Sequence, residues 1–162
     1  MDLGKILIVD ADDVSRQFLA QMLQKKDYAV FHAATGGEGL RQARDTTPDL
    51  IIFDSNLPDM RALEFVQQVQ QNQHISSTPC VVLTSKSDPE EMRACLAAGC
   101  AEYYLKSGMV MMTLVDSIPR LLIETRKVPA EKRKGLLVVF LSAKGGTGTT
   151  SLCSNIAMSL VR

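Results

Sequence analysis

Five short apolar runs recur along the chain, and each is followed by a segment whose apolar residues have the spacing of a helix. The runs occupy residues 5–9, 28–33, 49–54, 79–84 and 101–105. Most of them are continuously apolar, which is typical of strands covered on both faces of a parallel sheet. Because crossovers between parallel strands are right-handed, the pattern predicts an α/β fold with an open, five-stranded, doubly wound parallel sheet.

In such a sheet, binding and catalytic residues gather at the carboxyl ends of the strands. Here those ends carry the polar residues Asp10, Asp12, Asp13, Asp54, Asn56, Thr84 and Lys106. Clustered carboxylates repel one another unless a cation compensates, and Mg²⁺ prefers oxygen ligands and often keeps a phosphate as a further one. Carboxylates, a hydroxyl and one lysine at the same edge suit an aspartyl-phosphate site, in which the metal and the lysine neutralise phosphoryl oxygens.

Not all three acids after the first run need belong to such a site. An aspartate before a helix is often only its N-cap, because its carboxylate accepts hydrogen bonds from N–H groups of the first turn. Asp12 and Asp13 are open to this interpretation. Polar residues at the ends of four strands are harder to explain by capping alone.

Residues 1–125 resemble a response-regulator receiver domain of two-component signalling, in the stretches ILIVDADDVSRQFL, PDLIIFDSNLPDM, VVLTSKSD and AEYYLKS. The resemblance implies a flavodoxin-like (βα)5 fold and a phosphorelay in which Asp54 is the phospho-acceptor. It also implies the acidic-pocket residue Asp10, a backbone carbonyl of Asn56 for Mg²⁺, the switch hydroxyl Thr84, the switch aromatic Tyr103 and the phosphate-binding Lys106. The metal ligands would then be Asp10, Asp54 and Asn56.

The sequence departs from the family pattern beside that metal site. The family has two adjacent acids after its first strand, and the second position holds Ala11 here. Asp12 would replace the missing ligand if the loop shifts. The usual glycine after LPDM is Ala62, and the usual proline after the lysine is Ser107. Two interpretations stay open: a receiver that is phosphorylated by a histidine kinase, and a pseudo-receiver with weakened Mg²⁺ affinity that works through protein contacts.

The composition changes after the receiver-like part. Residues 126–135 carry five basic residues with a proline and a glycine, and are predicted to be a solvated linker. Residues 136–162 are predicted to form a strand, a glycine-rich loop and a helix, the order in which phosphate-binding loops are built. The stretch AKGGTGTTS resembles the deviant Walker A motif of the partition-type ATPases, the ParA and MinD family. The resemblance implies an incomplete nucleotide site at Lys144, Gly145, Gly146, Gly148 and Thr150.

A receiver-like domain joined to the start of such an ATPase resembles the TadZ and CpaE family of pilus-assembly proteins. That resemblance implies a regulatory and localising role, with a position at a cell pole. The later lysine of the ATPase motif is replaced by Thr149, and further ATPase motifs do not follow. We therefore expect a piece of a longer protein, with ATP as a cofactor of the full-length protein only, and we expect no enzyme in the ordinary sense.

Charge and hydropathy narrow the classes of partner. Eighteen basic and eighteen acidic residues give a net charge of zero, so we expect no nucleic-acid partner. No apolar run approaches the roughly 20 residues of a membrane span, and the N-terminus lacks a signal-peptide pattern, so a cytoplasmic protein is predicted. The four cysteines lack metal-ligand spacing and are interpreted as reduced core residues.

The expected partners are therefore other proteins, either a histidine kinase or the pilus machinery. The stretch GMVMMTLV (108–115) in the fifth helix contains more methionine than one helix face needs, and methionine adapts to partner surfaces. The surface of the fourth and fifth helices is thus a candidate interface, including for a homodimer. Ordinary core packing is the alternative.

Overall fold

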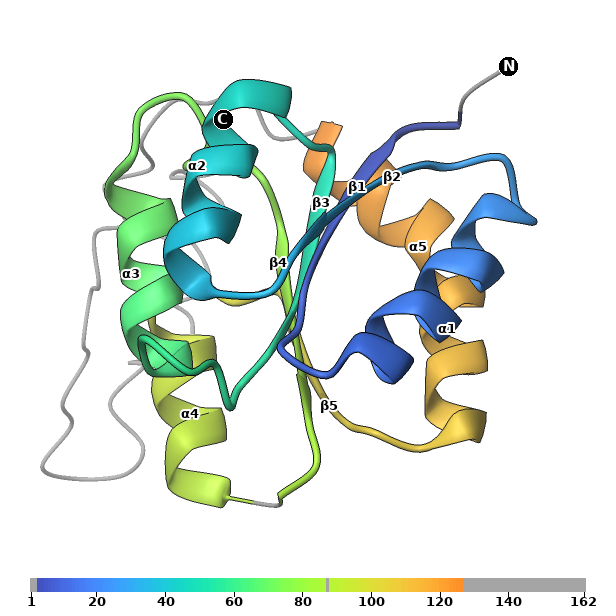
Figure 1. Ribbon diagram of the computed structural model, residues 1–162. Helices are drawn as coiled ribbons and strands as arrows, with labels where there is room; N and C mark the ends of the chain where they lie inside the picture. The colour runs from blue at the N-terminus through green and yellow to red at the C-terminus, as the bar shows by residue number, and fades with distance from the viewer. Residues whose placement is uncertain (1–2, 87, 127–162) are drawn as a thin grey trace, which may run out of the picture. The chain divides into compact units, whose positions relative to one another are not determined.

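The computed structural model describes residues 3–86 and 88–126, all within the first of the two units into which the chain divides, Met1–Ala130 and Glu131–Arg162. Strands and helices alternate along this part as predicted (Figure 1). The strands are β1 (Lys5–Val9), β2 (Ala29–Ala33), β3 (Leu50–Asp54), β4 (Cys80–Thr84) and β5 (Glu102–Leu105). The helices are α1 (Asp13–Gln24), α2 (Gly36–Thr46), α3 (Ala62–Gln71), α4 (Pro89–Ala97) and α5 (Gly108–Arg126).

The strands pair in parallel to form one sheet with the order β2-β1-β3-β4-β5. The chain builds β2 outward from β1, crosses back to β3, and then continues to β4 and β5. The order therefore reverses between β1 and β3, and ligand sites of open α/β sheets form at the carboxyl ends of the strands beside this point.

Helices cover both faces of the sheet: α2, α3 and α4 lie on one face, and α1 and α5 on the other (Figure 1). Successive side chains of a strand point to opposite faces. Accordingly Leu7 packs in a core cluster with residues of α2, α3 and α4, whereas Ile6 and Ile8 pack with α1 and α5. All residues of β3 and β4 are buried. The predicted doubly wound parallel sheet is confirmed.

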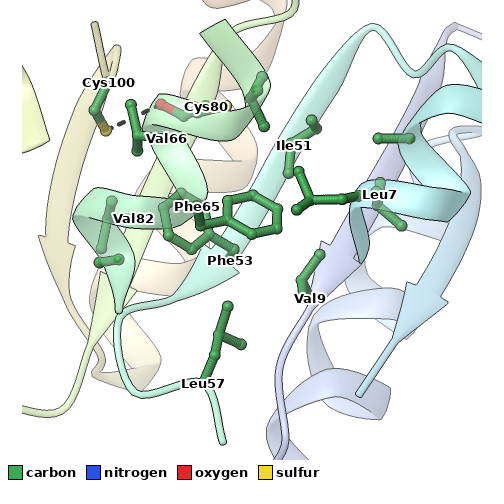
Figure 2. Close-up of a cluster of buried hydrophobic side chains, with 14 of the residues drawn as sticks. Leu7, Val9, Ile51, Phe53, Leu57, Phe65, Val66, Cys80, Val82 and Cys100 are labelled. Atoms are coloured by element: carbon green, nitrogen blue, oxygen red, sulfur yellow. Dashed lines mark hydrogen bonds between the residues drawn. The ribbon is translucent and has the colours of Figure 1, made fainter. Parts of the chain in front are cut away.

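The core beneath α3 is centred on two aromatic rings. Phe53 of β3 and Phe65 of α3 have ring centroids 4.5 Å apart, in a tilted arrangement (Figure 2). Aromatic pairs at this distance add to the stabilisation that comes from burial itself. The strand that ends at Asp54 is thereby held from the α3 side.

The three cysteines of the described part are free and buried, as interpreted from the sequence; Cys153 lies outside it. Burial raises the pKa of the Cys95 thiol to about 11 and that of Cys100 to about 12, and it also raises the pKa of Cys80. The Cys100 thiol donates to the carbonyl oxygen of Cys80 at 3.2 Å (Figure 2). Thiols with raised pKa values are poor nucleophiles.

Side-chain caps fix where several helices begin. Asp88 accepts hydrogen bonds from the N–H groups of Glu90 (2.9 Å) and Glu91 (3.2 Å) and is thus the N-cap of α4. At α2, the carboxylate of Asp59 accepts from the N–H groups of Gly36 (2.7 Å) and Gly37 (2.8 Å). Because Asp59 belongs to the loop after β3, this second cap ties that loop to α2.

The observed elements differ from the sequence prediction in small ways. Four of the predicted strands begin one residue later than expected, which is within the usual uncertainty of strand ends. Val14 and Phe18 have the helical spacing expected of α1, but their side chains are 75% and 47% exposed. The buried face of α1 is formed by Leu19, Ala20 and Leu23 instead. The helix α5 continues on both sides of Pro119.

Candidate functional site

Two buried carboxylates lie at the carboxyl ends of neighbouring strands. Asp10 follows β1 and is 5% exposed, and Asp54 ends β3 and is 8% exposed. The ammonium of Lys106, which follows β5, donates to Oδ2 of Asp10 at 2.7 Å and to Oδ2 of Asp54. The structure thus brings together three of the residues predicted from the strand ends.

Each carboxylate is oriented by a backbone N–H two residues further along. Oδ1 of Asp10 accepts from the N–H of Asp12 at 2.9 Å, and Oδ1 of Asp54 accepts from the N–H of Asn56 at 2.9 Å. The turns after the two strands therefore aim both Oδ2 atoms at Lys106.

The charges of this cluster do not cancel. Burial raises the pKa of Asp10, although the hydrogen bond from Lys106 opposes the rise. Burial alone would lower the pKa of Lys106, but the hydrogen bonds and charges of Asp10 and Asp54 outweigh it and raise that pKa. With both carboxylates ionised, one ammonium faces two negative charges, and the cluster retains an attraction for a further cation.

Asp12 and Asp13 lie outside this cluster. Oδ2 of Asp12 accepts from the N–H of Ser15 at 3.0 Å, so Asp12 is the N-cap of α1, and these hydrogen bonds lower its pKa. Asp13 pairs with the guanidinium of Arg16. The capping interpretation of Asp12 is confirmed, and its suggested role as a replacement metal ligand stays a prediction.

The donor atoms nevertheless fit a hard divalent cation. Each Oδ atom of Asp10 and Asp54 accepts one hydrogen bond and therefore keeps a second lone pair. Mg²⁺ is commonly bound by one or two carboxylates while it retains several waters. Within residues 3–86 and 88–126 there is no group of three or more His, Cys, Asp or Glu side chains placed to hold a metal. The fit is therefore to a site with two carboxylates, and the carbonyl of Asn56 stays the further ligand that the family resemblance implies.

Thr84 ends β4, the strand next to β3, and is only 2% exposed. Its hydroxyl donates to the carbonyl oxygen of Lys86 (3.0 Å) and accepts from the N–H of Lys86 (3.1 Å) and from Oγ of Ser55 (2.7 Å). The sequence analysis did not single out Ser55. A hydroxyl residue directly after the candidate phospho-acceptor was the signal that could have found it.

Tyr103 lies one strand further along, in β5, where it pairs with Val82 of β4. Its hydroxyl donates to Oε2 of Glu91, on α4, at 3.1 Å. Desolvation and this contact with Glu91 raise the pKa of Tyr103 to about 12, while the nearby hydroxyl of Thr84 acts in the opposite direction. The Tyr103 side chain thus links β5 to α4.

The surface of α4, β5 and α5 is partly apolar. Met109 and Met112 are 80% and 60% exposed, and Leu96 and Leu105 are also exposed, whereas Met111 is buried at 7%. The methionine-rich stretch therefore contributes to both the core and the surface. No helix of the described part is long and apolar enough to cross a membrane. The predicted linker and the nucleotide-binding residues Lys144, Gly145, Gly146, Gly148 and Thr150 lie outside the described residues.

Comparison with known sequences places the same region in one family. The family model of the response regulator receiver domain matches residues 6–116. The KDP operon transcriptional regulatory protein KdpE of Escherichia coli is 37% identical over 101 residues, which is 62% of this chain and 44% of KdpE. Response regulator ArlR of Staphylococcus saprophyticus is 36% identical over 102 residues, 63% of this chain and 45% of ArlR. The chain thus spans less than half the length of these two relatives.

Solved structures agree with the fold described above. A CheY-like receiver domain protein from Methanospirillum hungatei superposes with a TM-score of 0.71 at 30% identity, covering 78% of this chain and 98% of that one. The chemotaxis response regulator CheY4 of Vibrio cholerae gives a TM-score of 0.66 at 33% identity, covering 73% and 98%. The chain therefore belongs to the response regulator receiver domain family.

Proposed function

We propose that this chain is a phosphorylatable receiver, which takes a phosphoryl group on Asp54 from a phosphohistidine of a histidine kinase. The observation that carries the proposal is the contact of one ammonium, that of Lys106, with both buried carboxylates. An ammonium held in this way is already in place to neutralise phosphoryl oxygens, so little reorganisation is needed when charge develops.

The strand order favours Asp54 over Asp10 as the acceptor. The strand of Asp54, β3, lies between β1 and β4, so a phosphoryl group on Asp54 has Asp10 on one side and Thr84 on the other. A phosphoryl group on Asp10 would not be next to Thr84, because β3 lies between β1 and β4 in the sheet. Asp54 is thus the position that every other polar residue of the site surrounds.

In the proposed reaction an oxygen of Asp54 attacks phosphorus and forms an acyl phosphate. The bond from phosphorus to the imidazole nitrogen of the donor breaks, and its electron pair leaves with the imidazole. Bound Mg²⁺ would supply charge neutralisation for the phosphoryl oxygens. Asp10 and Asp54, with the carbonyl of Asn56, would hold the metal. Lys106 would donate to an oxygen of the phosphoryl group.

The contact of Lys106 with both Asp10 and Asp54 argues against the pseudo-receiver alternative. Ala11 leaves one carboxylate fewer than the family pattern, but the two that remain converge on one lysine. A signalling module, and not an enzyme acting on an external substrate, is the role we infer. The signal would pass to proteins, with the exposed apolar surface of α4, β5 and α5, which includes Met109 and Met112, as the contact for a partner or a second copy.

The pilus-assembly interpretation remains a second candidate. It depends on the resemblance of residues 136–162 to the partition-type ATPases, and those residues lie outside the described part. Several proposals depend on this interpretation: the resemblance to TadZ and CpaE, ATP as a cofactor of the full-length protein, and a position at a cell pole. A cytoplasmic location also stays a proposal. The family match ends at residue 116 and supports the receiver function alone.

Beryllofluoride, which mimics a phosphoryl group on a carboxylate, tests the site directly. Titrated with Mg²⁺ present, the wild-type protein is expected to bind it saturably, and Asp54→Asn is expected not to bind. Asp45→Asn, which changes an exposed carboxylate on α2, is the matched control and should behave as the wild type. Binding that survives Asp54→Asn would contradict the proposal.

A further inference from the structure

The hydroxyl of Ser55 connects the candidate phospho-acceptor strand to Thr84. Ser55 follows Asp54 directly, and its Oγ donates to Oγ1 of Thr84 at 2.7 Å. Its backbone N–H donates to the carbonyl oxygen of Leu83 at 2.9 Å and so extends the pairing of β3 with β4 by one residue. Because Ser55 is half-buried and Thr84 is almost fully buried, water competes weakly for this hydrogen bond.

This bond is one of three in which the Thr84 hydroxyl takes part, and the single proton of that hydroxyl is donated elsewhere. A hydroxyl has one proton to donate and two lone pairs to accept with. Thr84 donates to the carbonyl oxygen of Lys86 and accepts from Ser55 and from the N–H of Lys86. None of these three bonds reaches the side chains of Asp54 or Lys106.

We propose that Ser55 is a positioning residue, which holds the Thr84 hydroxyl in a resting arrangement directed at Lys86 and away from Asp54. The proposal rests on the phosphorylation of Asp54 proposed above. For Thr84 to donate to a phosphoryl oxygen on Asp54, it must release the carbonyl of Lys86 and move its Oγ1. The hydrogen bond from Ser55 favours the resting arrangement and opposes that movement.

The consequence is a shift in the balance between two arrangements of Thr84. A phosphoryl group or its mimic binds best to the arrangement in which Thr84 has turned toward it. Its apparent affinity therefore falls as the fraction of protein in the resting arrangement rises. Removing the Ser55 hydroxyl lowers the cost of leaving the resting arrangement, so the mimic should bind more tightly.

Beryllofluoride titrations of the intact protein with saturating Mg²⁺ measure this effect. Ser55→Ala is expected to bind about fivefold more tightly than the wild type, the equivalent of one ordinary net hydrogen bond. Ser55→Thr retains the donor and should bind like the wild type. Ser117→Ala is the matched control, since Ser117 is also half-buried and its hydroxyl donates to the carbonyl oxygen of Leu114, on α5.

A double-mutant cycle separates this role from a general loosening of the site. Thr84→Ala removes the group on which Ser55 acts, so adding Ser55→Ala to it should leave the affinity unchanged. Equal or weaker binding by Ser55→Ala than by the wild type would overturn the role of Ser55, as would an undiminished Ser55→Ala effect in the Thr84→Ala background. Failure of the wild type itself to bind would overturn the phosphorylation of Asp54 as well, so the two failures are distinguishable.

Discussion

Lys106 contacts Asp54 across a strand: Asp54 ends β3, Lys106 follows β5, and β4 lies between these two strands. The long lysine side chain reaches across the carboxyl end of β4 and also contacts Asp10, which follows β1. The contact therefore links the two halves of the sheet at the edge where the site lies. All three side chains are at most 11% exposed.

Lys106→Met should destabilise the protein, because it leaves two buried carboxylates without their counter-ion. We expect a loss of about 3–5 kcal/mol in the free energy of unfolding at pH 7, measured by urea denaturation. The loss should shrink as the pH falls and Asp10, whose pKa is raised by burial, becomes protonated. Lys86→Met, at an exposed position, should change the stability by no more than about 0.5 kcal/mol. Equal losses in the two variants would contradict this account of Lys106.

The pH dependence of stability should include a contribution from Asp59. Burial raises its pKa, but the hydrogen bonds from Gly37 and Gly36 outweigh burial and lower the pKa below the usual value of 3.8. A lowered pKa means that the folded state favours the ionised form, so this stabilisation is present above pH 3.8 and disappears as the pH falls through the folded-state pKa.

Asp59→Ala should therefore cost about 1 kcal/mol at pH 7, in line with other helix caps, and much less near pH 2. Thermal melting over this pH range measures the difference. Asp45→Ala is the control, because it removes an exposed carboxylate of α2 that does not cap the start of the helix. A cost for Asp59→Ala that is independent of pH would show that the charge of Asp59 contributes nothing.

Glu91→Gln should lower the pKa of Tyr103 from about 12 toward 10 without reaching it. The substitution removes the negative charge of Glu91, while the desolvation that contributes most to the raised pKa remains. Titration of tyrosinate absorbance measures this, and the chain has three tyrosines and no tryptophan to obscure the signal. Glu90→Gln, at the neighbouring position, should leave the pKa of Tyr103 unchanged. An equal fall of that pKa in Glu90→Gln would argue against a specific contact with Glu91.

Adjacent methionines in α5 should respond in opposite ways to substitution. Met111→Ala should cost about 2–3 kcal/mol, because the side chain is buried. Met112→Lys should leave stability within about 0.5 kcal/mol, because that side chain is 60% exposed. If the proposed self-association occurs at this surface, Met112→Lys should weaken it in sedimentation measurements. A large loss of stability in Met112→Lys would contradict the assigned orientation of the helix.

The sheet and its helices could be predicted because the local signals agree with the fold. Apolar runs such as residues 49–54 are long enough to identify strands, and the acids on both sides of Pro89 mark a helix start. Strand order and parallel pairing then bring Asp10 and Asp54 to one edge, so their proximity followed from topology alone.

Contacts between side chains from distant parts of the chain could not be predicted in the same way. The bond of Ser55 to Thr84 depends on the register of β3 against β4, and that of Tyr103 to Glu91 depends on how α4 packs. Asp12 was equally consistent with a cap and with a metal ligand, because both roles place an aspartate after a strand. The hydrogen bond from the Ser15 N–H shows the cap, and the metal role stays a prediction.

Incubation with acetyl phosphate and Mg²⁺, followed by intact-mass measurement, tests the central claim most directly. The account predicts that the wild-type chain gains the mass of one phosphoryl group, and that Asp54→Asn gains none. Asp45→Asn should be labelled like the wild type. An unmodified wild-type protein under conditions that label another receiver, or a phosphoryl adduct that persists in Asp54→Asn, would contradict it.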